Sequence, residues 1–352
     1  MIQSITDLNE FEDIREEWDA LYRSSGISNL FLTHKWLCNW IRHFGGNRWA
    51  AIIERGPVKE VPTTAVVFRI HEKSISHIDT SHSYFPGILH LKDNDAPLKN
   101  ILPYLKKSYK PRAVNLLQNL KDGSILRGIQ SLTGTDWYVL ERSSYKMRAI
   151  DIYDDFDLYL AGLNKKVRHE IKRKIRRIKK DGPLVLHRFD KPDDMEKLFK
   201  IISDVEKNSW KYRSGSAILS SESEYNYYRN IFDIYSQDSL ARSYVLTINN
   251  IPVSYVLGVV CDSIYYALKT SYTESHARFS PGTVLFSRII QELSLKEGDV
   301  SRIELLGDDA RWKKEICTDS RIYCTHSLFP VGIFSFLYVS AYKYYKGRKE
   351  RK

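Results

Sequence analysis

Apolar residues recur along the chain at two spacings, and each spacing predicts a different kind of element. Within residues 5–45 they lie three or four positions apart, as Trp18 and Leu21 do, which is typical of amphipathic helices. Shorter apolar runs bounded by turn residues then predict strands. The expected order after residue 45 is strands 49–53, 61–70 and 74–78, helix 98–107, strand 113–117, helix 124–131 and strand 137–141. The polar stretch 142–148 indicates a domain boundary.

The second half repeats this order of helices followed by a strand meander, with clearer signals. Asn249-Asn250 lies between two apolar runs and predicts a hairpin turn. The expected order is strand 184–189, helices 192–210 and 220–235, strands 241–248, 253–260 and 264–273, a helix from Ser280 to Glu297, strand 302–306, a short helix, and strand 321–329. We therefore expect an α+β fold in which mixed, mostly antiparallel sheets are flanked by helices.

The pattern divides the chain into four segments. These are an N-terminal domain at 1–148, a basic helical segment at 149–182, a C-terminal domain at 183–330, and a C-terminal amphipathic helix with a basic tail at 331–352. A length of 352 residues suits two domains of ordinary size.

Positive charge is concentrated in two places. Lys165–Lys180 holds ten Lys/Arg and one Glu, and Lys343–Lys352 holds six Lys/Arg and one Glu. The total of +11 leaves −3 for all other residues, so the body is near neutral. Such clusters favour an anionic partner.

The first basic cluster predicts an amphipathic helix. Val167, Ile171, Ile175 and Ile178 follow one another at helical spacing and should pack on the body. The candidate contacts to an anionic partner on the opposite face are Arg168, Lys172, Arg173, Arg176 and Arg177. Three interpretations stay open: an anionic membrane or lipid-linked glycan, tRNA, or a solvated face with no specific partner.

The apolar segment 328–342 is the one stretch that resembles a membrane segment. It contains Pro330 and Gly332 and is shorter than the ~20 residues that span a bilayer. A helix packed on the domain, an interfacial anchor and a true span are the alternatives.

Cysteine and histidine spacing indicates neither disulfides nor a metal site. No two of the four cysteines have CxxC spacing, and no histidine cluster completes a ligand set. With no signal-peptide pattern at the start, we expect a cytoplasmic protein, with peripheral membrane contact as the alternative. His82, in a loop near Tyr84, is a minor candidate for substrate binding.

Several short motifs occur in a recognisable order. They are residues 31–36 (FLTHKW), the Arg-rich helix ending at Asp181-Gly182, Ser209-Trp210-Lys211, Pro252, Ser280-Pro281-Gly282, and Gly307-Asp308 followed by Trp312-Lys313. Together they resemble the acetyltransferase family of cellulose- and exopolysaccharide-biosynthesis type, which is related to the Fem-type peptidyltransferases. The likeness covers roughly residues 5–345, and the order of elements in the second half is that of a Gcn5-related N-acetyltransferase (GNAT).

This resemblance implies two tandem GNAT-like domains and acyl transfer from acetyl-CoA or another acyl-CoA. The implied acceptor is an amine or hydroxyl of a sugar or lipid-linked glycan, without a metal. Two other functions stay open: aminoacyl transfer from tRNA, as in Fem-type enzymes, and a scaffold without activity that binds a membrane or carbohydrate.

The expected acyl-CoA site is the helix start near residue 280, where free backbone N–H groups attract phosphate. The candidate residues are Arg278, Ser280, Gly282 and Thr283. The family pattern has Gln/Arg-x-x-Gly-x-Gly/Ala at this point, whereas this chain has a single glycine.

Acyl transfer needs a base, a group that stabilises the oxyanion, and a proton for the leaving thiolate. Asp308 is the candidate base at a strand end, and Glu304 is a second carboxylate whose alternative role is to pair with an arginine. In the GNAT fold the end of the long helix that is predicted here over 192–210 borders the acceptor groove. The candidate substrate contacts are Trp210, Lys211, Tyr212, Arg213 and Lys313.

Overall fold

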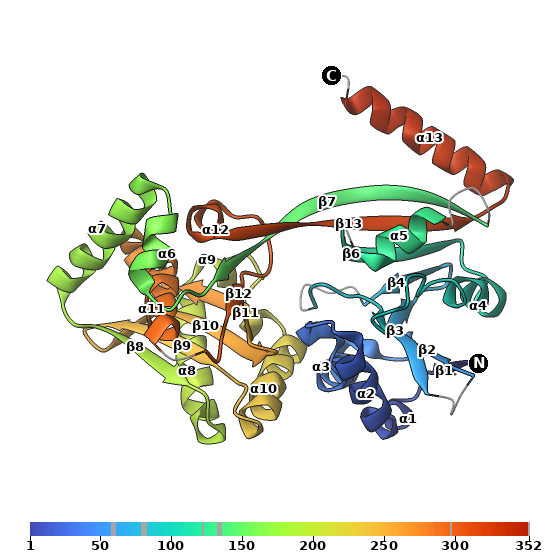
Figure 1. Cartoon of the computed structure of the whole chain (residues 1–352). Helices are drawn as coiled ribbons and strands as arrows, with labels where there is room; N and C mark the ends of the chain where they lie inside the picture. Colours follow the sequence, from blue (N-terminus) through green and yellow to red (C-terminus); the bar gives the residue numbers. More distant parts are fainter. Residues whose placement is uncertain (58–60, 79–82, 122, 132–135, 296–297, 351–352) are drawn as a thin grey trace. The chain divides into compact units, whose positions relative to one another are not determined.

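The computed structural model describes residues 1–57, 61–78, 83–121, 123–131, 136–295 and 298–350. The chain forms two compact units. Unit 1 comprises Met1–Tyr145 and Ile322–Lys352, and unit 2 comprises Lys146–Arg321. Both junctions fall inside strands, in β7 (Trp137–Asp151) and β13 (Asp319–Pro330). Figure 1 labels the elements of each unit.

Unit 1 begins with a strand and a group of helices, which precede its meander. The elements are β1 (Ile2–Ile5), α1 (Leu8–Asp13), α2 (Arg15–Ser25), η1 (Leu30–Leu32), α3 (His34–Trp40), η2 (Ile41–Gly45), β2 (Trp49–Arg55), β3 (Pro62–Ile70), β4 (Ser74–His77), β5 (Leu89–His90), α4 (Ile101–Ser108), β6 (Ala113–Leu120), α5 (Ser124–Ser131), and, from the end of the chain, α13 (Ile333–Glu350). Its strand order is β1-β2-β3-β4-β6-β13, with β5 paired to β3.

Unit 2 has a similar order of elements, preceded by the two helices α6 and α7. Its elements are α6 (Phe156–Gly162), α7 (Lys165–Asp181), β8 (Leu184–Phe189), η3 (Pro192–Asp194), α8 (Met195–Lys207), α9 (Trp210–Arg213), η4 (Ile218–Ser220), α10 (Glu222–Gln237), β9 (Ser243–Ile248), β10 (Ile251–Cys261), β11 (Ile264–Tyr272), η5 (Glu274–Phe279), α11 (Pro281–Leu295), β12 (Arg302–Glu304) and α12 (Arg311–Ile316). Its strand order is β7-β12-β11-β10-β9-β8.

Among the described residues, each unit has a parallel strand pair within a mostly antiparallel sheet. In unit 1 the pair is β4 and β6, joined through α4, and in unit 2 it is β11 and β12, joined through α11. A parallel pair needs such a crossover, because a tight turn cannot return the chain in the same direction. The prediction of an α+β fold with a repeated topology is confirmed, but the described strands belong to one mixed sheet and not to the separate sheets that we expected.

The last strands of the two units are exchanged along the chain. β7 follows α5 of unit 1, but its end pairs with β12 of unit 2 through Ile150↔Ile303. β13 follows α12 of unit 2, but its end pairs with β6 of unit 1 through Leu328↔Val114. The part of the sheet that belongs to each unit is therefore completed by a strand that enters from the other unit.

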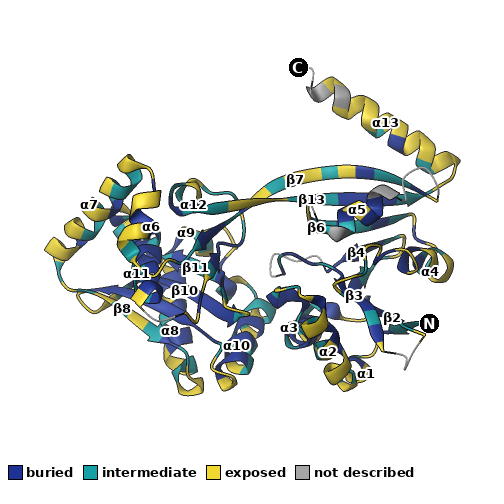
Figure 2. Cartoon of the chain, in the orientation of Figure 1, coloured by how far each residue is buried: buried dark blue, intermediate teal, exposed yellow. Residues whose placement is uncertain are grey.

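The sheet of unit 2 is buried on both faces, which explains its long apolar runs. All six residues of β9 are buried. Helices α8 and α10 cover one face, while α11, α6 and the apolar side of α7 form a core with the other. Ile171 and Ile178 of α7 belong to that core, as the helical spacing predicts. Figure 2 shows the remaining surface of α7 as mostly exposed.

Three boundaries differ from the sequence analysis. β7 continues through the polar stretch 142–148, because main-chain pairing holds a strand even where its side chains are exposed. The helix predicted over 192–210 is interrupted after Lys207. The C-terminal helix predicted over 331–352 begins at Ile333, and the strand predicted over 321–329 extends over Asp319–Pro330. The residues after 321 also group with unit 1 instead of the C-terminal domain.

Candidate active site

The two parallel strands of unit 2 part after a short paired stretch. Tyr266 and Glu304 form the last of three matched pairs between β11 and β12. β11 continues to Tyr272, whereas β12 ends at Glu304. Beyond this point the two strands no longer form main-chain hydrogen bonds with each other. Their free N–H and C=O groups must find other hydrogen-bond partners.

Two lysine ammonium groups bind main-chain carbonyls on either side of this divergence. Lys313 Nζ, from α12, donates to the carbonyl oxygens of Leu306 (2.6 Å) and Asp308 (2.9 Å). Lys211 Nζ, from α9, donates to the carbonyl oxygen of Thr270 (2.7 Å) in β11. The divergence of β11 and β12 therefore has a cation on each side.

Burial and mutual repulsion make both lysines unusual. The pKa of Lys313 is lowered to about 8, first by burial and then by repulsion from Lys211, while Asp308 and Asp309 oppose the shift. The pKa of Lys211 is lowered to about 8 by burial and by repulsion from Lys269, against the attraction of Glu206. Two such cations form a site that an added negative charge would stabilise.

This shift predicts a pH dependence of stability. Between pH 8 and the ordinary lysine value of 10.5, the unfolded chain holds a proton at position 313 that the folded chain has lost. The free energy of unfolding should therefore rise with pH across this window relative to Lys313→Met. Denaturant unfolding of both proteins at several pH values measures it. A difference that is constant or shrinks with pH would contradict the assignment.

The loop after β12 is held in place by an ion pair. Gly307 has φ 87°, a conformation that favours glycine, and turns the chain out of the strand. Arg148 of β7 then forms an ion pair with Asp309, and this contact holds the pKa of Asp309 at about 2. The side chain of Asp308, between these two anchors, is exposed.

The start of α11 follows β11 through the short helix η5. Ser280 adopts a left-handed conformation with φ 52° immediately before the helix. A Cβ atom added at Gly282 would meet nothing within 4 Å. The first turn of this 15-residue helix thus has open space at Gly282, whereas Thr283 is buried.

Arginines gather around this helix start. The guanidinium of Arg278 lies 4.5 Å from the ring centre of Phe279, and that of Arg177, from the basic helix α7, lies 5.7 Å from it. Arg278 also forms an ion pair with Asp181 at 3.0 Å. The packing of α7 against η5 and α11 thus brings the basic helix to the start of α11.

A family comparison decides what this arrangement belongs to. Residues 165–314, which contain both lysines, the strand divergence and the start of α11, match the family model described as "Acetyltransferase (GNAT) domain". This region is a GNAT acetyltransferase domain. No curated protein sequence matches the chain significantly.

Solved structures extend the GNAT fold to the whole chain. A structure of FemX is 13% identical, covers 94% of this chain and 97% of its own, and has a TM-score of 0.59. A tandem GNAT protein from the clavulanic acid pathway is 10% identical, with coverages of 95% and 99% and a TM-score of 0.53. A domain of an Agrobacterium fabrum protein, titled a putative lysylphosphatidylglycerol synthetase, is 10% identical, with coverages of 90% and 92% and a TM-score of 0.56.

These comparisons confirm a tandem GNAT fold, which the FemX structure shares, and residues 165–314 form a GNAT domain of the acetyltransferase type. The match is to GNAT domains at large. The cellulose or exopolysaccharide type therefore stays a prediction.

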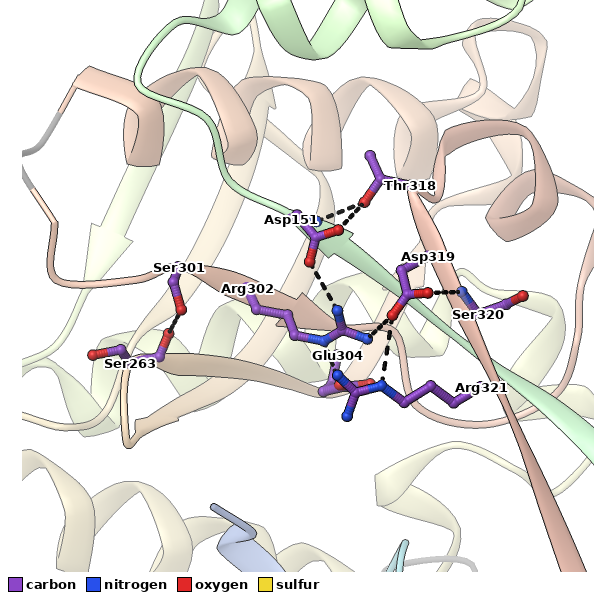
Figure 3. Close-up of polar contacts among 9 residues, drawn as sticks. All are labelled: Asp151, Ser263, Ser301, Arg302, Glu304, Thr318, Asp319, Ser320 and Arg321. Atoms are coloured by element: carbon purple, nitrogen blue, oxygen red, sulfur yellow. Dashed lines mark hydrogen bonds and ion pairs between the residues drawn. The ribbon is translucent and has the colours of Figure 1, made fainter. Parts of the chain in front are cut away.

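Glu304 lies in the GNAT domain but is occupied by an ion pair. Arg302 Nε contacts Glu304 at 2.8 Å, and its terminal nitrogens contact Asp151 (2.8 Å) and Asp319 (2.6 Å). Figure 3 shows the guanidinium surrounded by these carboxylates, with Arg321 near Asp319. This is the arginine pairing that the sequence left open as an alternative. The arrangement ties β7, β12 and β13 together and leaves Asp308 as the accessible carboxylate.

Four of the predicted substrate residues, Trp210 to Arg213, make up the short helix α9. Trp210 and Tyr212 are exposed, and Arg213 forms a bidentate ion pair with Glu274. Lys211 and Lys313 are close enough for their charges to interact, as two residues of one site should be. His82 lies outside the described residues.

Sequence reasoning missed the buried groups beside Lys211. Glu206 is buried and accepts hydrogen bonds from the Tyr255 hydroxyl (2.6 Å) and the Leu219 N–H (3.3 Å), and burial raises its pKa. Lys269 of β11 has its pKa lowered by burial. A glutamate on the apolar stripe of α8, directly after Val205, was the available signal.

Proposed function

We propose that the GNAT domain transfers an acyl group from an acyl-CoA to an amine or hydroxyl of a sugar in an envelope or exopolysaccharide precursor. The observation that carries this proposal is the pair of ammonium groups, Lys211 and Lys313, at the divergence of β11 and β12. An ammonium that already binds two carbonyl oxygens is held in position, so it can stabilise developing negative charge without reorganising.

The start of α11 supports the choice of donor. Free N–H groups at a helix start bind phosphate, and open space at Gly282 lets a phosphate approach the backbone. Arg278 and Arg177 add positive charge at the same place. These residues fit the phosphates of CoA, with Ser280 at the entrance to the helix.

The chain's own residues divide the chemical work as follows. A bound acyl-CoA would supply the activated carbonyl and a thiol leaving group. Asp308 accepts the proton of the attacking amine or hydroxyl, and Lys313, assisted by Lys211, stabilises the oxyanion of the tetrahedral intermediate. As the new bond to the acyl carbon forms and the carbon–sulfur bond breaks, the proton passes to the sulfur.

The donor site can be tested with Gly282→Val. Because the side chain enters open space, the variant should fold, but it should weaken CoA binding more than about tenfold, or ~1.4 kcal/mol. Isothermal titration with acetyl-CoA measures the effect. Gly162→Val is the matched control, since a Cβ there also meets nothing within 4 Å. Equal binding by Gly282→Val and wild type would place the donor elsewhere.

The acceptor assignment rests on the charge of α7. Its exposed cations are Lys165, Lys166, Lys172, Arg173, Arg176, Arg177, Lys179 and Lys180. Ion pairs engage Arg173, with Glu170, and Lys172, with Asp157. Such a surface suits an acceptor that carries phosphate, such as a glycan linked to a lipid diphosphate.

The same surface favours aminoacyl-tRNA as the second candidate donor. Titration of the protein with bulk tRNA, beside the titration with acetyl-CoA, separates the two functions. Binding of tRNA that weakens steeply with salt, without binding of acetyl-CoA, would put aminoacyl transfer first. Binding of neither donor would support the scaffold without activity.

A further inference from the structure

Helix α13 exposes an unusual concentration of large apolar side chains. Within residues 331–345 the exposed ones are Val331, Ile333, Phe334, Phe336, Leu337, Tyr338, Tyr344 and Tyr345. Elsewhere in the described chain such side chains are scattered, which is normal for a protein surface. A continuous apolar patch, in contrast, marks an interaction site. Figure 2 shows α13 as largely exposed.

Contacts with β7 fix which side of α13 faces unit 1. The guanidinium of Arg142 lies 4.6 Å from the ring centre of Tyr342 and donates to the Tyr338 hydroxyl at 2.9 Å. Lys346 Nζ donates to the carbonyl oxygen of Glu141 at 3.4 Å. Positions 338, 342 and 346 are four residues apart and thus share one side of the helix.

The opposite side of α13 carries the apolar stripe. Ile333, Leu337 and Tyr344 follow one another at spacings of four and seven, and the exposed Phe334 and Tyr345 lie between this stripe and the side that contacts β7. We call these five residues the outer face of α13. Lys343 and Arg348 are exposed on the same helix, which holds four Lys/Arg and one Glu.

We propose that the outer face of α13 is a membrane-binding surface that lies in the headgroup region of an anionic bilayer. An apolar stripe with tyrosines and bordering cations is the pattern of helices that lie in the plane of the interface. Among the described residues no helix is long and apolar enough to cross a membrane. The surface belongs to unit 1 and does not depend on the acyl donor of unit 2.

Charge distinguishes a membrane from a second copy of the chain. A second α13 would bring the same lysines and arginines to the contact, and it would not supply negative charges to pair with them. Anionic headgroups supply that complement, at a density that attracts each nearby Lys or Arg. The outer face therefore fits a lipid surface better than its own copy.

Co-sedimentation of the full chain with vesicles tests the proposal. Vesicles of phosphatidylcholine mixed with phosphatidylglycerol should pellet the protein, pure phosphatidylcholine should pellet much less, and added salt should release it. Leu337→Glu should reduce binding at least about tenfold. The change removes apolar area that the bilayer would bury, and it adds a negative charge that anionic headgroups repel. Ile251→Glu is the matched control, since Ile251 is 56% exposed and Leu337 57%; it should bind like wild type.

Three outcomes would overturn the proposal. They are no pelleting with either vesicle, equal pelleting with both, and wild-type binding by Leu337→Glu. Sedimentation velocity without lipid tests whether the outer face instead binds a second copy of the chain. A dimer that Leu337→Glu dissociates, together with no vesicle binding, would assign the outer face to a second copy.

Discussion

Replacing Arg302 with methionine should lower the free energy of unfolding by about 3–5 kcal/mol, the usual effect of removing one partner from a buried ion pair. The Arg302 side chain is 12% exposed and binds three carboxylates, of which Glu304 is buried. Methionine retains apolar volume but leaves Glu304 as an uncompensated charge. Denaturant unfolding followed by circular dichroism measures the loss.

Arg311→Met is the control for this experiment. The Arg311 side chain is 91% exposed and pairs with Glu315 one turn along α12, so its loss should change stability by less than about 0.5 kcal/mol. Burial already raises the pKa of Glu304, so acid should restore part of the stability of Arg302→Met by protonating that carboxylate. A loss below about 1 kcal/mol, or no recovery in acid, would mean that the network is not a structural support.

Replacing Lys313 with methionine should reduce the acyl-transfer rate about 10²–10³-fold, the range seen when one oxyanion donor is removed. The fold should survive, since a buried ammonium is costly to hold and methionine fills similar volume. The rate constant with saturating acyl donor and acceptor, measured by thiol release, gives the effect.

Lys314→Met is the matched control on the same helix. Lys314 Nζ pairs with Asp309 at 3.2 Å and does not contact the carbonyl groups that Lys313 binds. We expect its rate to stay near that of wild type. Equal losses in the two variants would indicate that α12, rather than the ammonium of Lys313, supports the reaction. An unchanged rate in Lys313→Met would remove Lys313 from the proposed mechanism.

The repeated order of elements could be predicted from the sequence. In both units, segments with helical spacing of apolar residues and segments typical of strands are separated by clear turn residues. Asn249-Asn250 illustrates this, since both residues adopt the positive φ values of 51° and 62° that a tight hairpin turn requires. The long strand β7 could not be predicted. Its middle residues are mostly polar and only partly buried, and main-chain pairing with distant segments continues the strand through them.

The sequence indicated individual residues of the candidate site, but it did not indicate how their side chains are arranged. Lys211, Asp308 and Lys313 stood out by their motifs, yet nothing local shows that two lysines bind carbonyls on either side of a strand divergence. Glu304 was a candidate for chemistry with pairing to an arginine as the alternative, and its partner Arg302 lies two residues away on β12. The other carboxylates on that guanidinium, Asp151 and Asp319, come from β7 and β13, and local spacing does not contain these contacts.

The exchanged strands affect how the protein folds while the ribosome synthesises it. β6 finds its neighbour β13 only after a long delay, since the residues they bring together, such as Gln118 and Thr325, are 207 positions apart. Until then β6 remains an open edge to which other nascent chains can pair. Unit 2 is continuous and can complete its core in the meantime. Released chains that end at Arg321 should therefore protect unit 2 from protease while unit 1 stays sensitive, so that the first segment to be made is the last to mature.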